Sequence, residues 1–197
     1  MDETLVFLDE GLLYKLSEYF GKIKFDRIKF SEILAAKQRL ICKKIFYYNV
    51  PPFQSEIPTL DEEKRKKGYD KFIRSLSRHG KIIVREGRCQ RLKIGGKFTY
   101  GQKGVDVLLA MDLSNVPIKY PEIRKIILIS SDSDFVPIIK NLKEQEIKTL
   151  LYTFYETKDR RSIFSTSNEL IKSVYKYVLL TKQDFENSAL GKKEAIK

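Results

Sequence analysis

Histidine, cysteine and tryptophan are nearly absent from this sequence of 197 residues, which has one, two and none of them respectively. Cys42 and Cys89 lie far apart and in no metal-ligand spacing, a pattern typical of a reducing compartment. The single histidine, His79, ends a lysine-rich segment and has no partner of its kind. These scarcities argue against a zinc centre and against a Ser-His-Asp triad. Any catalysis is therefore expected to depend on carboxylates.

Long apolar runs are also missing, and none reaches the length needed to span a bilayer. The Met-Asp-Glu start lacks the basic lead and the small-residue cleavage site of a signal peptide. Hydrophobic residues make up 42% of the chain and aromatic residues 12%, which is too much for disorder throughout. We therefore expect a cytoplasmic globular protein that does not contact membranes, and one domain is the default at this length.

Negative charge is outnumbered as well, since 38 Lys and Arg residues stand against 26 Asp and Glu residues and the formal net charge is +12. Residues 61–100 hold two-thirds of this excess in one-fifth of the chain, and such a local field suits a polyanion such as nucleic acid. A well-solvated basic surface is the alternative, above all for the run 64–67, which spreads around most of a helix. The residues expected to contact nucleic acid are Lys64, Arg65, Lys66, Lys67, Arg74, Arg85, Arg88 and Arg91.

Apolar patterning predicts strands that alternate with helices. Short apolar runs predict strands at 5–8, 45–50, 125–129, 148–154 and 175–180. Helical spacing predicts helices at 12–20, 31–41 (with Ser31 as N-cap), 61–79, 105–113, 135–142 and 163–173. This order predicts one three-layer α/β domain over residues 1–180, with a central, mostly parallel sheet. Residues 61–100 are predicted to form a basic excursion from that sheet, a helix followed by strands at 81–85 and 88–94 and a turn at Gly95-Gly96. The polar residues 181–197 are expected to fray.

Aspartates occur where such a sheet would place a ligand. Asp9 directly follows the first strand, Asp132 and Asp134 follow the 125–129 strand, and Asp106 lies in the first turn of a helix. Ligands bind at the carboxyl ends of the strands in open parallel sheets. Clustered carboxylates repel one another unless a cation shares them, and ligands that are all oxygen suit Mg²⁺ or Mn²⁺. The alternative is that Asp106, Asp132 and Asp134 merely cap helices, whereas Asp9 has little structural use after an apolar strand.

Three segments resemble the motifs of the NYN domain, in its LabA-like branch within the PIN-like nuclease superfamily. They are Val6-Phe7-Leu8-Asp9-Glu10-Gly11, Gln102-Lys103-Gly104-Val105-Asp106-Val107, and residues 127–139 around Ser130-Ser131-Asp132-Ser133-Asp134. Their order and spacing agree with that family over about residues 4–180.

The resemblance implies a PIN-like fold and cleavage of RNA, rather than DNA, with Mg²⁺ or Mn²⁺. The residues it implies as catalytic and metal-binding are Asp9, Asp106, Asp132 and Asp134. It also implies that Ser130 lies at the pocket rim, where its hydroxyl meets a carboxylate or a phosphate, and that Lys103 contacts the scissile phosphate. Many PIN-like relatives dimerise, so a homodimer is a further expectation.

Departures from the family pattern bear on activity. The family's first motif often reads Asp-Gly-x-Asn, whereas this chain has Asp9-Glu10-Gly11-Leu12 and so lacks the asparagine. Glu10 either adds a ligand or points outward. Ser131 replaces a glycine that commonly precedes the Asp-Ser-Asp run. Asp112 would lie roughly 120° around a continuous helix from Asp106, so we expect it behind the ligands or in a capping role rather than on the metal.

Three functions remain open from the sequence. The first is a metal-dependent ribonuclease in which the basic segment holds the phosphate backbone while the aspartates cut. The second is a catalytically inactive nucleic-acid-binding or regulatory module on the same fold, which the missing asparagine and the extra Glu10 favour. The third is a phosphatase or another hydrolase of small phosphoesters that uses the same carboxylates.

Overall fold

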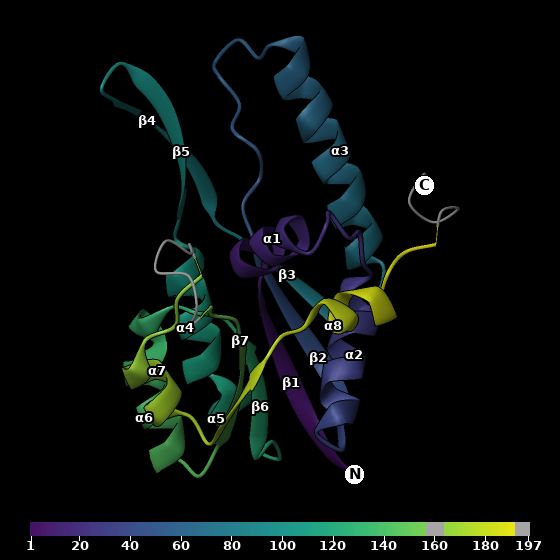
Figure 1. The fold of residues 1–197 in the computed structure, drawn as a ribbon, viewed down its shortest axis with the longest axis vertical. Helices are drawn as coiled ribbons and strands as arrows, with labels where there is room; N and C mark the ends of the chain where they lie inside the picture. The colour runs from purple at the N-terminus through teal and green to yellow at the C-terminus, as the bar shows by residue number, and fades with distance from the viewer. Residues whose placement is uncertain (157–163, 192–197) are drawn as a thin grey trace.

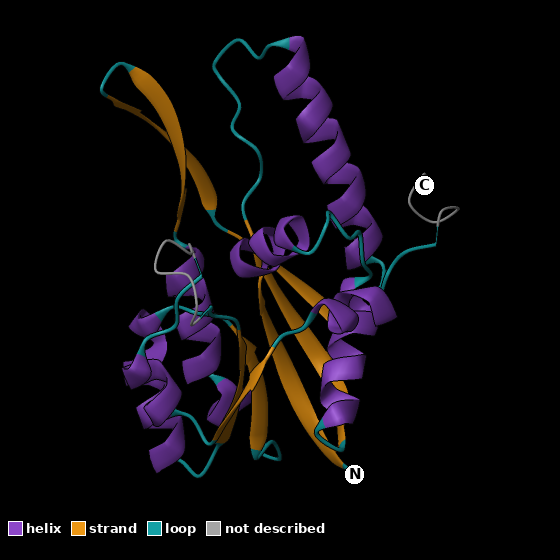
Figure 2. Ribbon diagram, in the orientation of Figure 1, coloured by secondary structure: helices purple, strands orange, loops and turns teal. Residues whose placement is uncertain are grey.

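A six-stranded parallel sheet forms the centre of the computed structural model, which describes residues 1–156 and 164–191. Its strands lie in the order β3-β2-β1-β6-β7-β8, and all five neighbouring pairs are parallel. Helices cover both faces (Figures 1 and 2). The expected three-layer α/β architecture with a mostly parallel sheet is therefore confirmed. The strands are β1 (Asp2–Asp9), β2 (Leu40–Asn49), β3 (Ile82–Glu86), β6 (Lys125–Ile129), β7 (Lys148–Thr153) and β8 (Lys176–Leu179).

Strands β1 and β6 lie at the centre of the sheet and explain the apolar runs of the sequence. The side chains of residues 5–8 and 126–129 are fully buried because both faces of these strands are covered. The chain runs outward from β1 to β3 on one side of the sheet and from β6 to β8 on the other. The direction in which successive strands are added thus reverses between β1 and β6. A crevice opens at the carboxyl ends of two neighbouring strands whose connections run to opposite sides in this way.

One face of the sheet packs against α1 (Glu10–Tyr19), α2 (Arg27–Lys37), α3 (Leu60–Ser77) and α8 (Lys182–Asn187). The other face packs against α4 (Val105–Ser114), α5 (Val116–Lys119), α6 (Val136–Glu144) and α7 (Asn168–Ser173). A short 3₁₀ turn, Ser133–Phe135, precedes α6 and buries Phe135 under it. Each face has its own apolar cluster, so the sheet separates two cores.

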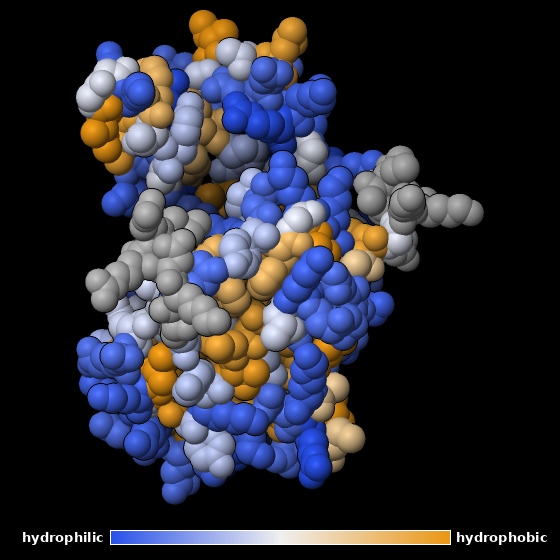
Figure 3. Space-filling view, viewed as in Figure 1, coloured by the Kyte–Doolittle hydropathy of each residue, from blue (hydrophilic) through white to orange (hydrophobic). Residues whose placement is uncertain are grey.

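Two arms extend beyond the carboxyl end of the sheet (Figure 1). One is the first half of α3. The other is an antiparallel ribbon of β4 (Arg88–Ile94) and β5 (Lys97–Lys103) that is not paired with the central sheet. Apolar side chains stand exposed near both tips, among them Leu60 at 85% and Ile94 at 63% (Figure 3). The predicted excursion is thus narrower than 61–100, because β3 joins the central sheet as its edge strand beside β2.

Helix α2 begins earlier than the sequence suggested, and Ser31 is not its N-cap. Asp26 caps the helix, accepting hydrogen bonds from the backbone N–H of Ile28 (2.7 Å) and Lys29 (3.0 Å). Ser31 is buried one turn later and donates to the carbonyl of Arg27 at 2.7 Å. The predicted start at Ser31 missed the first turn of the helix, which holds the cations Arg27 and Lys29 and the apolar Ile28 as well as Phe30, buried in the core.

The end of the chain is not frayed as predicted, as far as residue 191. Helix α8 places the fully buried ring of Phe185 against Phe25, 4.8 Å away, and Asp184 forms an ion pair with Lys37. A single aromatic residue anchors this polar helix, because its ring completes the core between α2 and the sheet. Residues 192–197, like residue 163 of the predicted 163–173 helix, lie outside the described residues, and helix α7 begins later than predicted, at Asn168. Among the residues that are described, no helix is both long and apolar enough to cross a bilayer.

Candidate functional site

Acidic side chains converge on the crevice between β1 and β6. Asp9 ends β1, Asp132 follows β6, and Asp106 is in the first turn of α4. All three line one open pocket of about 670 Å³ at the carboxyl end of the sheet. Three separate segments therefore bring carboxylates to one place, as expected from the positions of the residues at strand and helix ends.

Asp9 is held by the start of α1 and by the loop after β6. Its Oδ1 accepts a hydrogen bond from the backbone N–H of Gly11 at 2.9 Å, so Asp9 is the N-cap of α1 and has a structural role that the sequence analysis did not expect. Its Oδ2 accepts from the Ser130 hydroxyl at 3.3 Å. Burial, with a smaller contribution from the negative charge of Asp106, raises the pKa of Asp9 to about 6, although the hydrogen bonds that it accepts lower it. A carboxylate in such surroundings is stabilised by any cation that enters the pocket.

Asp106 owes its position to the backbone before it. Gly104 has a positive φ of 82° and starts α4 without a side-chain cap, so the first turn of the helix presents Asp106 towards the pocket. The pKa of Asp106 is raised by desolvation and then by the charges of Asp132 and Asp134. The four acids thus influence one another across three chain segments.

The turn after β6 is built from its own polar groups. The backbone N–H of Asp132 donates to the Ser130 hydroxyl at 3.2 Å, and that of Asp134 donates to Asp132 Oδ1 at 2.9 Å. Ser130 is fully buried and links this turn to Asp9, so it hydrogen-bonds a carboxylate from below the pocket and not from its rim. Asp134 is exposed beside the pocket and does not line it.

Glu10 lines the pocket and does not point outward, and its charge is paired within the protein instead of being free for a metal ion. It is 7% exposed and forms an ion pair of 2.5 Å with Arg27 at the start of α2. Asp112 is likewise neutralised, because Arg85 donates to both of its oxygens at 2.8 and 2.9 Å and Tyr48 donates to it at 2.9 Å. These two acids stabilise the fold around the pocket, each with its own arginine.

The four predicted metal ligands form no such ion pair, although Lys15 of α1 lines the pocket beside them. Asp9, Asp106, Asp132 and Asp134 form no ion pair with any described residue. Their donor set, carboxylate oxygens alone, fits Mg²⁺ or Mn²⁺ in its chemistry. In residues 1–156 and 164–191, however, no three acidic, histidine or cysteine side chains come together closely enough to hold a metal ion directly. Mg²⁺ usually keeps several water molecules in proteins, so a loosely spaced set of this kind can bind it through them.

The structure adds polar residues to the pocket that the sequence analysis did not single out, among them Tyr14, Lys15, Asn49 and Gln102. Asn49, at the carboxyl end of β2, lines it, and so does Gln102 near the end of β5, whereas its neighbour Lys103 is exposed and does not. Asn49 carries the signal that marked Asp9, a polar residue directly after a buried strand. Its amide donates to the Tyr47 hydroxyl at 3.0 Å and its oxygen accepts from the Val50 N–H at 2.8 Å.

The predicted basic residues are distributed over α3, the edge strand β3 and the β4–β5 ribbon. Lys64, Arg65 and Lys67 are exposed on α3, and Arg88 is exposed at the base of the β4–β5 ribbon. Others make contacts within the protein: Lys66 pairs with Asp70 (2.5 Å), Arg74 donates to the Asp70 carbonyl (3.2 Å), Arg85 holds Asp112, and Arg91 lies over the rings of Phe53 and Phe98. None of the eight lines the acidic pocket, so any contact they make to nucleic acid lies outside it.

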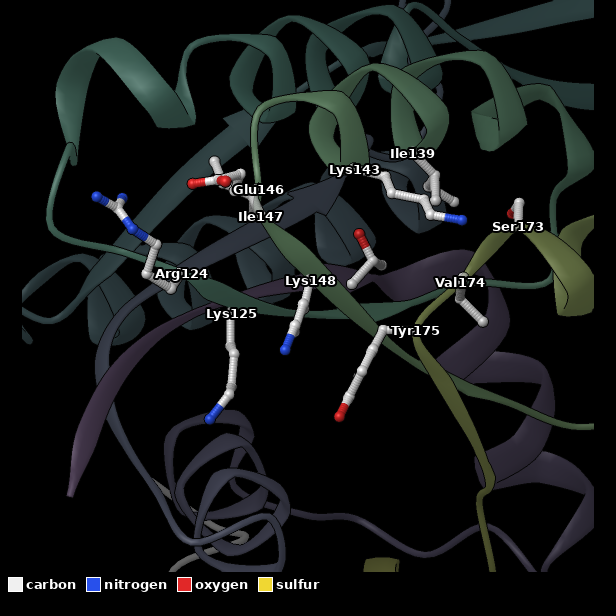
Figure 4. A pocket seen from close by; sticks show the side chains of 11 residues that line it. Arg124, Lys125, Ile139, Lys143, Glu146, Ile147, Lys148, Ser173, Val174 and Tyr175 are labelled. Atoms are coloured by element: carbon white, nitrogen blue, oxygen red, sulfur yellow. The ribbon is translucent and has the colours of Figure 1, made fainter.

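A second cavity, of about 690 Å³, lies at the amino end of the sheet, where β8 joins β7 (Figure 4). Figure 4 shows Lys125, Lys148 and Tyr175 projecting side by side, with Lys143 on the other side of β7. Arg124 and Glu146 also line the cavity, so its charge is mainly positive. It contains none of the predicted site residues.

Comparisons with known proteins agree with this fold. The family model described as "NYN domain" matches residues 4–180. No curated protein matches the chain. A crystal structure of a protein of unknown function from Vibrio parahaemolyticus is similar, with a TM-score of 0.57 and 16% sequence identity, and the match covers 96% of each chain. That likeness shows a shared fold. The family match spans most of the chain, and the parallel sheet with acids at its carboxyl end agrees with it. The protein therefore belongs to the NYN domain family.

Proposed function

We propose that this protein is a ribonuclease that uses Mg²⁺ or Mn²⁺ held by Asp9, Asp106, Asp132 and Asp134. One observation carries the proposal: acids from three chain segments share a pocket at the switch point of the sheet and form no ion pair with a described residue, although Lys15 lines the same pocket. Acids that serve only the fold are paired here, as Glu10 and Asp112 show. NYN domains are nuclease-like, which supports the same reading.

In such a site each of these residues would have its own role. Asp9, Asp106 and Asp132 would hold the ion in the pocket that they line, and Asp134 would add negative charge beside it. Ser130 keeps the Asp9 carboxylate in place, and the α1 N-terminus holds its other oxygen. A bound Mg²⁺ or Mn²⁺ would supply an activated water and neutralise the charge that develops on the phosphate. The basic residues on the two arms bind the phosphate backbone on either side of the scissile bond.

The test is metal-dependent cleavage of a labelled RNA by wild-type protein and by Asp132→Asn. This change removes a charge but keeps a side chain that can cap the turn. We expect cleavage to fall by a factor of about 10² or more, while RNA binding in EDTA is retained. Asp61→Asn, which removes an exposed acid in the first turn of α3, is the matched control and is expected to cleave normally. Equal cleavage by wild type and Asp132→Asn would show that the site assignment is wrong.

A second function, an inactive nucleic-acid-binding module, has its own supporting observations. Leu12 stands where the family often has asparagine, and no three acids are arranged to hold an ion directly in the described residues. This alternative predicts RNA binding that weakens with salt and no cleavage by wild type with either ion. The cleavage assay above therefore separates the two functions.

Finer assignments belong to the same proposal. The motif at 127–139 supports the LabA-like branch, and RNA is the proposed substrate in preference to DNA. The free thiols of Cys42 and Cys89 support a reducing, cytoplasmic location. A homodimer stays a prediction, which light scattering of the purified protein would check.

A further inference from the structure

The β4–β5 ribbon has two chemically different faces, and its register defines them. Residues opposite each other in an antiparallel pair point to the same side, and alternate residues along a strand do so too. Arg91 pairs with Tyr100 and Lys93 with Phe98, so these four side chains share one face. Leu92, Ile94 and Thr99 belong to the other face. Both aromatic rings of the ribbon therefore lie on a single face, together with two cations.

This aromatic face leads into the acidic pocket. Gln102 follows Phe98 and Tyr100 on the same face at intervals of two residues, and both Tyr100 and Gln102 line the pocket beside Asp9 and Asp106. A continuous track therefore runs from near the tip of the ribbon to the carboxylates. At the base, a side chain on Gly87 would come within 2.5 Å of the Lys103 carbonyl, so this glycine lets the ribbon join the body of the protein closely beside α4.

Phe53 completes the track from the neighbouring segment. The guanidinium carbon of Arg91 lies 4.5 Å from the centre of the Phe53 ring and 4.6 Å from that of Phe98. The rings of Phe53 and Tyr100 are 5.5 Å apart. The segment that carries Phe53 is tied to the start of α3, since the next residue, Gln54, donates to the Glu62 carbonyl at 2.9 Å. The track thus lies between the two basic arms.

The fold itself does not account for these rings. Neither apolar core includes a residue of the ribbon after Gly87 and before Val105. Phe98 is 55% exposed and Tyr100 is 56% exposed, despite their contacts with Phe53 and Arg91. A two-stranded ribbon that buries so little gains little stability from aromatic residues. Exposed rings interleaved with cations are instead what proteins present to the bases and phosphates of single-stranded nucleic acid.

We propose that Phe53, Arg91, Phe98 and Tyr100 bind the bases of single-stranded RNA and lead the strand into the acidic pocket. The inference rests on the proposed ribonuclease function and names its substrate class. Bases in a duplex are stacked on each other and offer no free face to these rings, so the track selects unpaired RNA. The guanidinium of Arg91, which lies over the Phe53 and Phe98 rings, adds positive charge towards the phosphate backbone.

Binding is tested with Phe98→Ala and with Leu92→Ala, which removes an apolar side chain from the opposite face of the same ribbon. Fluorescence anisotropy in EDTA measures the Kd for a short labelled oligouridine and for an RNA duplex of equal length. We expect Phe98→Ala to raise the Kd for the single strand by about 5- to 100-fold and to change the duplex Kd little. Leu92→Ala is expected to leave both values unchanged. The loss for Phe98→Ala should persist at high salt, because stacking is not ionic.

Three results would contradict the proposal that this track binds single-stranded RNA. They are an unchanged single-strand Kd for Phe98→Ala, an equal loss for duplex RNA, and an equal loss for Leu92→Ala. If wild type still cleaves RNA in these cases, the track is wrong and the ribonuclease proposal stands. If wild type binds and cleaves no RNA, both proposals fail. Circular dichroism on heating should show the same midpoint for both variants, since neither residue belongs to a core.

Discussion

At the carboxyl end of the central sheet the chain places Asp9, Asp106 and Asp132 around one cavity, whereas at the amino end it places Lys143 and Lys148 around another of nearly equal size. The acids form no ion pair in the described structure, and neither do these two lysines. Of the two cavities, only the one at the amino end attracts a polyanion electrostatically, yet phosphodiester chemistry needs the carboxylates. Positive charge alone is therefore a poor guide to the reactive site of this protein. The cations proposed to bind the phosphate backbone beside that site lie on the two arms.

Substituting the charged residues at each end of the sheet separately tests this difference most directly. Asp106→Asn removes one of the shared charges of the acidic pocket, and cleavage of RNA is expected to fall by about 10²- to 10⁴-fold. The double change Lys143→Gln and Lys148→Gln at the amino end is expected to leave the rate within about twofold, since an exposed charge far from the reaction acts only on encounter. Initial rates with Mn²⁺ measure both. A larger loss from the lysine pair would mean that the amino end takes part in catalysis.

At the acidic end we also expect an effect on the free energy of unfolding, which is smaller than the loss of cleavage described above. Asp9 has a pKa of about 6 in the folded protein against an ordinary value of 3.8. Between these values the folded state binds more protons than the unfolded state, so the metal-free protein loses stability as the pH rises through this window. Asp9→Asn keeps an N-cap side chain and removes the charge. It should raise the free energy of unfolding by up to about 3 kcal/mol above pH 6, and the gain should vanish below pH 3.8.

Urea unfolding in EDTA at pH 7.5 and at pH 3.5 measures this gain. Asp26→Asn, the same change at the N-cap of α2, serves as the control and is expected to give no such gain. A stability difference for Asp9→Asn that is equal at both pH values would contradict the assignment of a strained charge to Asp9.

The smallest effect is predicted at the amino end of the sheet. The Thr149 hydroxyl is buried without a hydrogen-bond partner in the described structure, whereas the buried Thr4 hydroxyl donates to the Lys125 carbonyl at 2.9 Å. Thr149→Val should stabilise the protein by about 1 kcal/mol, because it removes an unpaired polar group. Thr4→Val should destabilise it by about as much. Thermal unfolding of the two variants gives the sign, and a loss in both would mean that Thr149 finds a partner in solution.

Much of the candidate site could be predicted because its residues carry local signals. Asp9 and Asp132 follow fully apolar strands, and such strands lie in the middle of a parallel sheet whatever their neighbours are. Asn49 carried the same signal at the end of β2. Gln102 carried none, because its place in the pocket depends on the direction in which the ribbon leaves the body of the protein.

The partners of the charged residues could not be predicted in the same way. Nothing near Glu10 in the sequence shows that Arg27 neutralises it, and nothing near Asp112 points to Arg85. The polar composition after residue 180 hid one buried ring, Phe185, which helps to hold α8 on the core. These contacts join residues 17 or more positions apart, where local patterns carry no information.

The sequence by itself determined the three-layer architecture and the positions of Asp9, Asp106 and Asp132 at one edge of the sheet. Burial on both faces requires apolar strands, and the reversal of strand order opens a crevice at their carboxyl ends. Only the tertiary structure decided which acids stay uncompensated, since that depends on where Arg27 and Arg85 reach across the fold. It also decided that the ribbon turns its aromatic face towards the pocket, because the close approach at Gly87 sets the direction of the ribbon.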